Sequence, residues 1–264
     1  MRRIIIAELK RLFLNEYTKL FHYISLLLWP LLMFIQLFFN FYAFPIDSLA
    51  FLGIYSQKEL FSFLFVGFIA LLIFQSMVQS AWIMSFEKRQ GTLEVIFITP
   101  INKTLWLYSR TFSVVVVNSF VLLILLCISI TLTLGITIII IIQLILMIIA
   151  IMISSLIWGT LLNILFLYFR DGSLVFSILA GPEETFAGVK VPVSVMPTIL
   201  KFISGLIPLT YTVNLIREIF FLSSYWRYNL IAFLIVNLIL ICISVFLFKR
   251  IEKGMRKNGN LSLY

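Results

Sequence analysis

Long runs of apolar residues divide this chain, and their length limits the possible folds more than any other feature. From Leu105 to Ile157 the only charged residue is Arg110. A membrane-spanning helix needs ~20 apolar residues to cross a hydrocarbon core of ~30 Å, and the runs reach this length without the strict alternation of a membrane barrel. Because helices satisfy their own backbone hydrogen bonds in lipid, the sequence predicts an all-α integral membrane protein.

The composition supports this class, since 62% of the residues are hydrophobic and 12% are charged, against about 25% charged residues in soluble domains. Residues 1–264 are expected to form a single transmembrane domain. Gly181 and Pro182 interrupt the fifth span, so it either breaks there or leads into a re-entrant segment. We expect six spans, at about 21–43, 61–85, 106–134, 137–169, 172–189 and 229–249.

Two further segments lie outside these spans. Residues 1–20 place apolar side chains at helical spacings with basic residues between them, which predicts an amphipathic helix in the inner membrane interface. This helix either serves only as an anchor or also packs on a cytoplasmic subunit. Residues 181–228 are too apolar for a solvated loop and are interrupted by prolines. We expect two short helices there, at about 195–206 and 209–221, that dip into the outer leaflet and cap the bundle.

The distribution of lysine and arginine predicts the orientation. With both termini in the cytoplasm, 15 of the 20 basic residues fall on the inner side and 5 on the outer side, as the positive-inside rule requires. We therefore expect a multi-pass protein of the cell (plasma) membrane. The net charge of +9 is then an orientation signal and an attraction to anionic lipid headgroups, and it gives no reason to expect a nucleic-acid partner.

A charged loop at residues 86–104 separates the second and third spans. The preference of basic residues for the inner side of the membrane is enough to explain the basic residues of this loop. It does not explain the turn at Gly91, the helix start at Thr92 and the stop at Thr99 and Pro100. This pattern predicts a short helix along the inner membrane face that docks a cytoplasmic partner.

Two motifs resemble those of a known family. Glu87, Gly91-Thr92-Leu93-Glu94 and Thr99-Pro100 resemble the cytoplasmic-loop signature in the membrane subunits of ATP-binding-cassette type-2 exporters. Pro208-Leu209-Thr210-Tyr211 followed by Arg217 resembles the outer-segment pattern of the same family. The layout of spans and interfacial helices is also similar, over essentially the whole chain.

The resemblance implies a coupling helix in this loop, resting in a cleft of an ATPase subunit. The chain has no phosphate-binding loop of its own, so it is expected to lack an ATPase site, and ATP with Mg²⁺ would be bound by the partner subunit. A second membrane subunit, either identical or a paralogue, is also implied. The resemblance assigns ATPase coupling to Glu87, Gly91, Thr92, Leu93, Glu94, Thr99 and Pro100.

The remaining polar residues leave alternatives open. No cluster of metal ligands accompanies His22, and acids are essentially absent from the span interiors, so we expect no metal, no bound cofactor and no proton- or sodium-driven carrier. The outer charges either form an exit gate or are solvated or mutually paired; the candidate gate residues are Glu183, Glu184, Pro208, Tyr211 and Arg217. Some polar residues either bond between helices or line a substrate path: Gln36, Asn40, Gln75, Gln79, Asn118, Gln143 and Asn163.

These observations predict the membrane subunit of an ATP-driven exporter that moves an amphipathic, drug-like or lipid-linked compound out of the cytoplasm. The resemblance alone favours the drug, antibiotic or peptide branch, and a polysaccharide or lipid-linked glycan exporter is the alternative within the class. A non-transporting membrane scaffold or sensor that docks a cytoplasmic partner is the alternative outside it.

Overall fold

The computed structural model describes residues 2–16, 20–45, 54–135, 137–169, 172–221 and 225–258. Within these ranges the regular structure is helical and contains no strand. A single 3₁₀ turn, Val193–Val195, precedes α8. The helices are α1 (Arg2–Glu16), α2 (Leu20–Tyr42), α3 (Gln57–Arg89), α4 (Thr92–Ile98), α5 (Lys103–Leu134), α6 (Ile138–Tyr168), α7 (Gly172–Phe186), α8 (Thr198–Gly205), α9 (Pro208–Phe221) and α10 (Trp226–Asn258).

Three helices, α3, α6 and α10, are long and apolar enough to cross a membrane. Two further spans result if each of two bent pairs counts as one: the two halves of α5, which meet at 41°, and α8 with α9, which meet at 96°. The described apolar part of α2, Leu27–Tyr42, is shorter. The described residues therefore contain three to five candidate spans, so the prediction of a multi-pass helical protein is confirmed and the count of six is not.

Local sequence explains where the long helices begin. The side chains of Ser56, Asn102 and Thr137 accept hydrogen bonds from the backbone N–H groups three residues later, at the starts of α3, α5 and α6. These are residue types that favour the N-cap position. The 33 residues of α3 form a rod of roughly 50 Å, which extends beyond a hydrocarbon core of ~30 Å. The charged residues near both ends of α3 can therefore lie outside an apolar layer of this thickness.

The fifth predicted span, 172–189, differs from the structure. Helix α7 continues through Pro182 and ends at Phe186, because a helix can accommodate an internal proline at the loss of one backbone hydrogen bond. Its 15 residues extend over roughly 22 Å, less than a hydrocarbon core. Helix α7 by itself is therefore too short to cross the hydrocarbon core.

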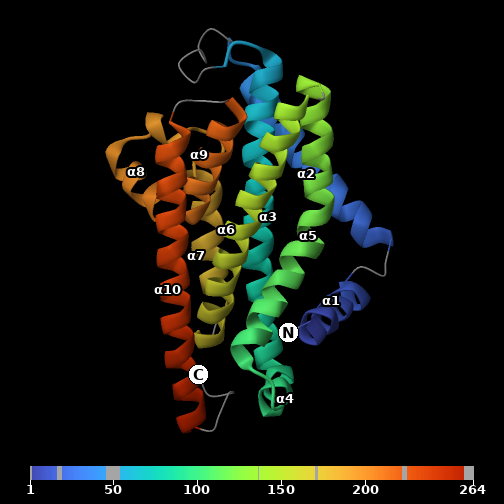
Figure 1. Cartoon of the computed structure of the whole chain (residues 1–264), viewed down its shortest axis with the longest axis vertical. Coiled ribbons are helices and arrows are strands. Elements are labelled where there is room, and N and C mark those ends of the chain that lie inside the picture. Colours follow the sequence, from blue (N-terminus) through green and yellow to red (C-terminus); the bar gives the residue numbers. More distant parts are fainter. Residues whose placement is uncertain are drawn as a thin grey trace.

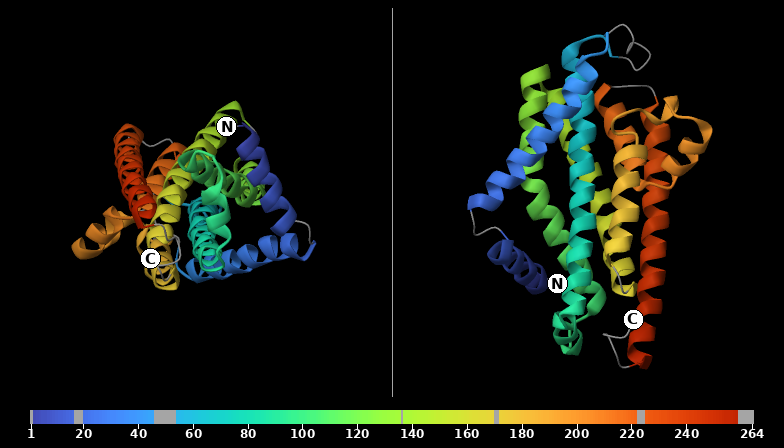
Figure 2. Two further views of the ribbon diagram at one scale, coloured as in Figure 1. Left: turned by 90° about the horizontal axis from the view of Figure 1, so that it is seen from below. Right: turned by 180° about the vertical axis from the view of Figure 1, so that it is seen from behind.

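Helix α3 forms the centre of the bundle. It packs against α2, α5, α6, α7 and α9, and every residue from 62 to 71 is buried. Figure 1 shows it running through the middle of the molecule, with α10 at one side. Figure 2 shows α1 and α2 meeting at a corner on the side away from α10. Phe34 of α2 packs edge-on against Phe61 and Phe65 of α3, with ring centres 5.2 and 4.7 Å apart.

The two outer helices occupy the segments in which the sequence predicts them, but their environments differ. Helix α9 lies within the bundle against α3, α6 and α10, and Val213 and Ile216 are completely buried. Helix α8 projects from the side of the bundle (Figure 1), with Ile199 and Phe202 more than 70% exposed. Their depth in a membrane stays a prediction.

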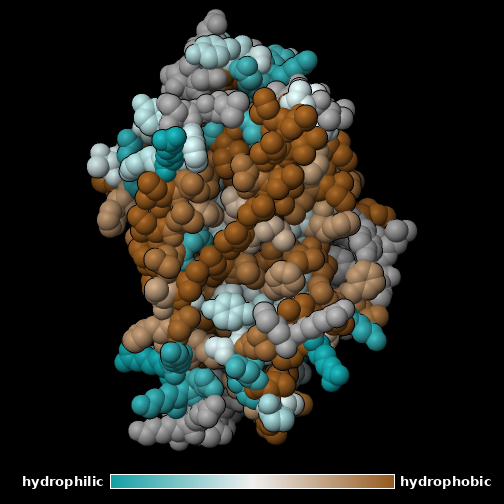
Figure 3. All heavy atoms as spheres, in the orientation of Figure 1, coloured by the Kyte–Doolittle hydropathy of each residue, from teal (hydrophilic) through white to brown (hydrophobic). Residues whose placement is uncertain are grey.

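The surface carries a broad apolar band. In Figure 3 hydrophobic residues cover the middle of the visible face and hydrophilic residues gather towards the two ends. Large apolar side chains of α10, such as Leu238 and Phe246, are more than 60% exposed. An apolar band between polar ends is the surface expected of a protein embedded in a bilayer.

Candidate functional site

The short helix predicted after Gly91 forms as α4. Gly91 adopts a left-handed φ of 74°, which glycine reaches without steric strain, and the chain turns there between α3 and α4. The hydroxyl of Thr92 donates a 2.9 Å hydrogen bond to the carbonyl of Glu87 and connects the start of α4 to the last turn of α3. Helix α4 ends where Thr99 becomes extended, the conformation favoured before Pro100.

One face of α4 is buried and the opposite face is exposed. Leu93 is 1% exposed and packs in a cluster with Trp106 of α5 and Phe248 of α10. Val95 and Ile98 are 67% and 84% exposed, at the end of the molecule where α4 protrudes below α5 (Figure 1). The bundle therefore holds α4 by its inner apolar face and leaves an outer apolar face uncovered.

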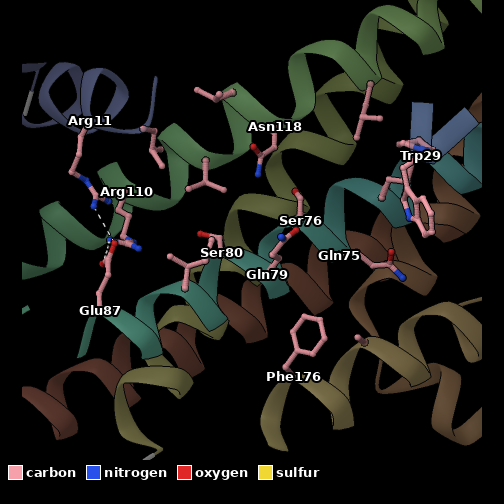
Figure 4. A pocket seen from close by; sticks show the side chains of 18 of the residues that line it. Arg11, Trp29, Gln75, Ser76, Gln79, Ser80, Glu87, Arg110, Asn118 and Phe176 are labelled. Atoms are coloured by element: carbon pink, nitrogen blue, oxygen red, sulfur yellow. Dashed lines mark hydrogen bonds and ion pairs between the residues drawn. The ribbon is translucent and has the colours of Figure 1, made fainter. Parts of the chain in front are cut away.

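A charged cluster joins α1, α3 and α5 close to α4. Arg110 Nη1 lies 2.7 Å from one carboxylate oxygen of Glu87, and Arg11 Nη1 lies 3.1 Å from the other. Arg11 also pairs with Glu8 at 3.0 Å, and Glu8 accepts a 2.8 Å hydrogen bond from the indole of Trp106. Figure 4 shows both guanidiniums converging on Glu87. The structure thus places the Glu87 side chain in a partly buried position, 18% exposed, where it joins three helices.

The two guanidiniums hold Glu87 in its ionised form. Burial raises the pKa of the Glu87 carboxyl, but the charges of Arg110 and Arg11 outweigh burial, so its pKa lies below the usual value. Burial likewise lowers the pKa of Arg11, and the carboxylates of Glu8 and Glu87 reverse that effect and raise it. Arg110 is only 2% exposed. Without Glu87 it would be a buried charge with no counter-ion.

Lys88 links the same end of α3 to α6. Its ammonium group donates a 2.6 Å hydrogen bond to the carbonyl of Leu167, in the last turn of α6. The final carbonyls of a helix lack partners within the helix and attract cations. Burial lowers the pKa of Lys88. Lys88 therefore connects α3 to α6, in addition to any contribution that its charge makes to membrane topology.

A cavity of about 550 Å³ lies between α1, α2, α3, α5 and α7, and the charged cluster forms one end of it. Its α2 wall contains Trp29, Pro30 and Met33. Figure 4 shows polar side chains of the α3 and α5 walls lining the same space. The polar wall residues are Gln75, Ser76, Gln79, Ser80 and Asn118.

The sequence left open whether certain intramembrane polar residues bond between helices or line a path, and the structure separates them. Gln75, Gln79 and Asn118 line the cavity. Gln143 of α6 donates a 2.7 Å hydrogen bond to the carbonyl of Ile219 in α9. Asn163 of α6 donates a 3.0 Å hydrogen bond to the hydroxyl of Thr111 in α5, whereas Gln36 and Asn40 are exposed on α2.

The predicted gate residue Arg217 is buried and binds a turn of the backbone. Its terminal nitrogens donate 2.6 Å hydrogen bonds to the carbonyls of Gly188 and Val189, just after α7. The guanidinium carbon lies 3.7 Å from the centre of the Phe63 ring on α3. Arg217 therefore connects α9, α3 and the chain leaving α7. None of the ion pairs among the described residues includes it.

The two adjacent acids of α7 have different surroundings. Glu184 pairs with Lys190 at 2.6 Å and is partly exposed, as the solvated or paired alternative predicts. Glu183 is 2% exposed and accepts a 2.7 Å hydrogen bond from the indole of Trp158. Glu183 is therefore neither solvated nor part of an ion pair among the described residues, because α6 and α7 enclose a position that looks solvent-exposed in the sequence.

Pro208 and Tyr211 shape the corner between α8 and α9. Pro208 is the first residue of α9, where the missing N–H of proline has no helical partner to lose. The hydroxyl of Tyr211 donates a 2.9 Å hydrogen bond to the carbonyl of Gly205 at the end of α8. Both residues support this bend, and a gating role for them stays a prediction.

The sequence motifs did not identify Arg11 and Arg110 as partners of Glu87. Arg110 gave the clearer signal, since it is the single charged residue of a long apolar stretch and such a residue needs a counter-ion. Its partner lies 23 residues away, and Arg11 lies 76 residues from the same carboxylate. Only the packing of α1 and α5 beside α3 brings these groups together.

Comparison with known proteins agrees with this architecture. A family model described as "ABC-2 type transporter" matches residues 3–221, a range that contains α4, the charged cluster and the cavity. The comparison with curated proteins found no match. The match covers most of the chain, and its family pairs such a permease with an ATPase on a separate subunit. The chain therefore belongs to the ABC-2 type transporter family, as a multi-pass membrane permease subunit without an ATPase site of its own.

Proposed function

We propose that this permease subunit exports an amphipathic compound from the cytoplasm and that its ABC ATPase partner docks on α4. One observation carries the proposal: α4 is packed firmly on its inner face while Val95 and Ile98 remain exposed on its outer face. Exposed apolar groups that are rimmed by polar residues are typical of partner-binding surfaces. In this proposal the partner subunit binds ATP and Mg²⁺.

The two faces of α4 suggest a division of the residues assigned to coupling. Leu93 and Glu87 lie on the inner side, where they contact the cluster around Trp106 and the guanidinium of Arg110. A displacement of α4 would thus move the inner ends of α3 and α5 together. The docking surface then consists of the more exposed residues Thr92, Glu94, Val95, Ile98, Thr99 and Pro100.

The cavity supports a small amphipathic cargo. Its volume of about 550 Å³ lies within the range of ~300–1,000 Å³ typical of drug-sized ligands. The amides of Gln75, Gln79 and Asn118 can bond the polar part of such a cargo, while Trp29 and Met33 contact its apolar part. These features favour the drug-like or lipid-linked cargo over the polysaccharide alternative.

Three further elements complete the proposal. A second membrane subunit, most simply another copy of this chain, joins the first, since one permease chain supplies only part of a transport path. The termini and α4 lie in the cytoplasm, as the excess of basic residues predicts. The assembly resides in the cell membrane.

The test combines partner binding with transport. The tagged chain is purified with a candidate ABC ATPase of the same cell, reconstituted in lipid vesicles, and assayed for ATP hydrolysis and for movement of a fluorescent amphipathic dye. Ile98→Gln removes exposed apolar surface from α4. Tyr55→Gln is the matched control, because Tyr55 is 72% exposed just before the opposite end of α3.

The native chain and Tyr55→Gln are expected to bind the ATPase equally. Ile98→Gln is expected to weaken binding about ten-fold, since loss of ~1.4 kcal/mol has that effect and a buried aliphatic side chain contributes ~1.5–3 kcal/mol. Equal binding by all three chains would exclude α4 as the docking site. If the ATPase binds the chain normally but the reconstituted complex moves no dye, the scaffold alternative is favoured.

A further inference from the structure

Glu183 is a carboxylic acid enclosed by this chain alone. It lies in the last turn of α7, is 2% exposed, and accepts a 2.7 Å hydrogen bond on Oε1 from the indole N–H of Trp158 in α6. The other carboxyl oxygen, Oε2, is buried and has no hydrogen-bond partner among the described residues. Neither lipid nor a second subunit is required to remove this group from water.

The surrounding elements supply no counter-ion within the described part of the chain. None of the ion pairs there includes Glu183. Arg217 of α9 donates its terminal nitrogens to backbone carbonyls, and Lys190 is paired with Glu184. Lys201 of α8 is exposed.

The helices α3 and α6 beside α7 also supply no counter-ion for Glu183. Helix α3, which packs against α7, has no charged residue between Glu59 and Glu87, and α6 has none at all. Glu218 of α9 is a second acid, and its Oε2 is buried without a hydrogen-bond partner among the described residues. An acid supplies no counter-ion for Glu183, so the charged groups of the described residues favour an uncharged Glu183 side chain.

The free-energy cost of burying the Glu183 side chain differs between its ionised and its neutral form. Burial of an unpaired ionised carboxylate is far more costly than burial of the neutral carboxyl, because the neutral group leaves at most one hydrogen bond unmade. We propose that Glu183 is a proton-binding site, held as the neutral acid against Trp158, that releases its proton when the contact between α6 and α7 opens to water. On release the carboxyl O–H bond breaks, its electron pair stays on the carboxylate, and the proton passes to water.

The local structure favours such an opening. Pro182 lies directly before Glu183 inside α7 and has no N–H to donate to the preceding turn, so the end of α7 lacks one backbone hydrogen bond. Water solvates the ionised form only in the open conformation. By linkage, a rise in pH therefore increases the population of that conformation. This property does not depend on the proposed ATPase partner, and each inference can fail without the other.

The first test detects the proton directly. The infrared C=O band of a protonated carboxyl is recorded on the full chain at pH 7 in micelles of a detergent without ester groups, whose C=O absorption would overlap the band. An ordinary glutamate, with a pKa of ~4.3, has no such band at this pH. Glu183→Gln has nearly the same shape as the neutral acid, and Glu184→Gln is the matched control at the neighbouring exposed position. The band is expected in the native chain and in the control, and its intensity is expected to be lower in Glu183→Gln. Its absence from the native chain at pH 7, or an equal intensity in Glu183→Gln and the control, would overturn the proposal.

Two further measurements test the geometry and the opening. Trp158→Phe removes the N–H that the carboxyl accepts, so the infrared band should move to higher wavenumber; an unmoved band would contradict the contact. Backbone hydrogen exchange of residues 181–187 is then compared between the native chain and Glu183→Gln at equal pH. The ratio of native to variant exchange is expected to rise from acidic to alkaline pH, and a constant ratio would rule out proton release on opening.

Discussion

Gly67 of α3 faces the guanidinium of Arg217 so closely that a Cβ atom on the glycine would lie 2.8 Å from Nη2. The same guanidinium is fixed by the carbonyls of Gly188 and Val189 and by the ring of Phe63. It cannot move aside without breaking one of these contacts. The absence of a side chain at position 67 therefore allows α9 and the turn after α7 to approach the middle of the bundle.

The substitution Gly67→Ala is expected to destabilise the protein by about 1–3 kcal/mol, the usual cost of inserting a methyl group into a packed site. The measurement is the thermal unfolding midpoint in detergent micelles. Gly205→Ala is the control, since its Cβ would meet only the Tyr211 hydroxyl at 3.7 Å. Equal midpoints for the two variants would show that Arg217 can relocate without cost.

Loss of the carboxylate at position 87 is expected to be more damaging. Glu87→Gln leaves Arg110, 2% exposed, without its counter-ion, and breaking a buried pair in this way costs about 3–5 kcal/mol. Adding Arg110→Met to Glu87→Gln should recover part of the loss, because it removes the unpaired charge. The control Glu184→Gln breaks a half-exposed pair and should cost no more than ~1 kcal/mol. A double variant less stable than Glu87→Gln would contradict the assignment.

The charged cluster also predicts how stability depends on pH. The pKa of Glu87 is lower in the folded protein than its ordinary value of ~4.3, so its contribution is complete above that value and is lost as pH falls through the folded pKa. The difference in unfolding midpoint between the native chain and Glu87→Gln should therefore be constant near pH 7 and shrink on acidification below ~4. A difference that grows on acidification would reverse the sign and refute the pairing.

Position 91, in the turn before α4, is expected to accept glycine better than any residue with a side chain. A Cβ at Gly91 would contact nothing within 4 Å, so the cost of Gly91→Ala comes from the left-handed φ alone, about 1–2 kcal/mol. Gly181→Ala, at another uncrowded glycine but within a helix, serves as the control and should be neutral or slightly stabilising. Stability is measured by thermal unfolding, and coupling by ATP hydrolysis of the reconstituted complex. The tilt of α4 should change with the strained turn, so Gly91→Ala is expected to reduce hydrolysis more than the control does.

The sequence by itself determined the class of this protein and the position of the short helix α4. Apolar runs of sufficient length allow only helices in lipid, and the residues around Gly91 and Pro100 set the ends of α4 through local backbone preferences. These properties depend on neighbours in the chain. They are therefore readable without knowing how the helices pack.

Only the tertiary structure decided which groups meet. Helices that are apolar on every side carry no periodic pattern that identifies the buried face, so the sequence could not show that Arg11 and Arg110 converge on Glu87. The same limit concealed the difference between Glu183 and Glu184, which are adjacent in sequence but separated by burial. Contacts between residues far apart in the chain depend on helix packing, and that packing places one acid in the interior and the other at the surface.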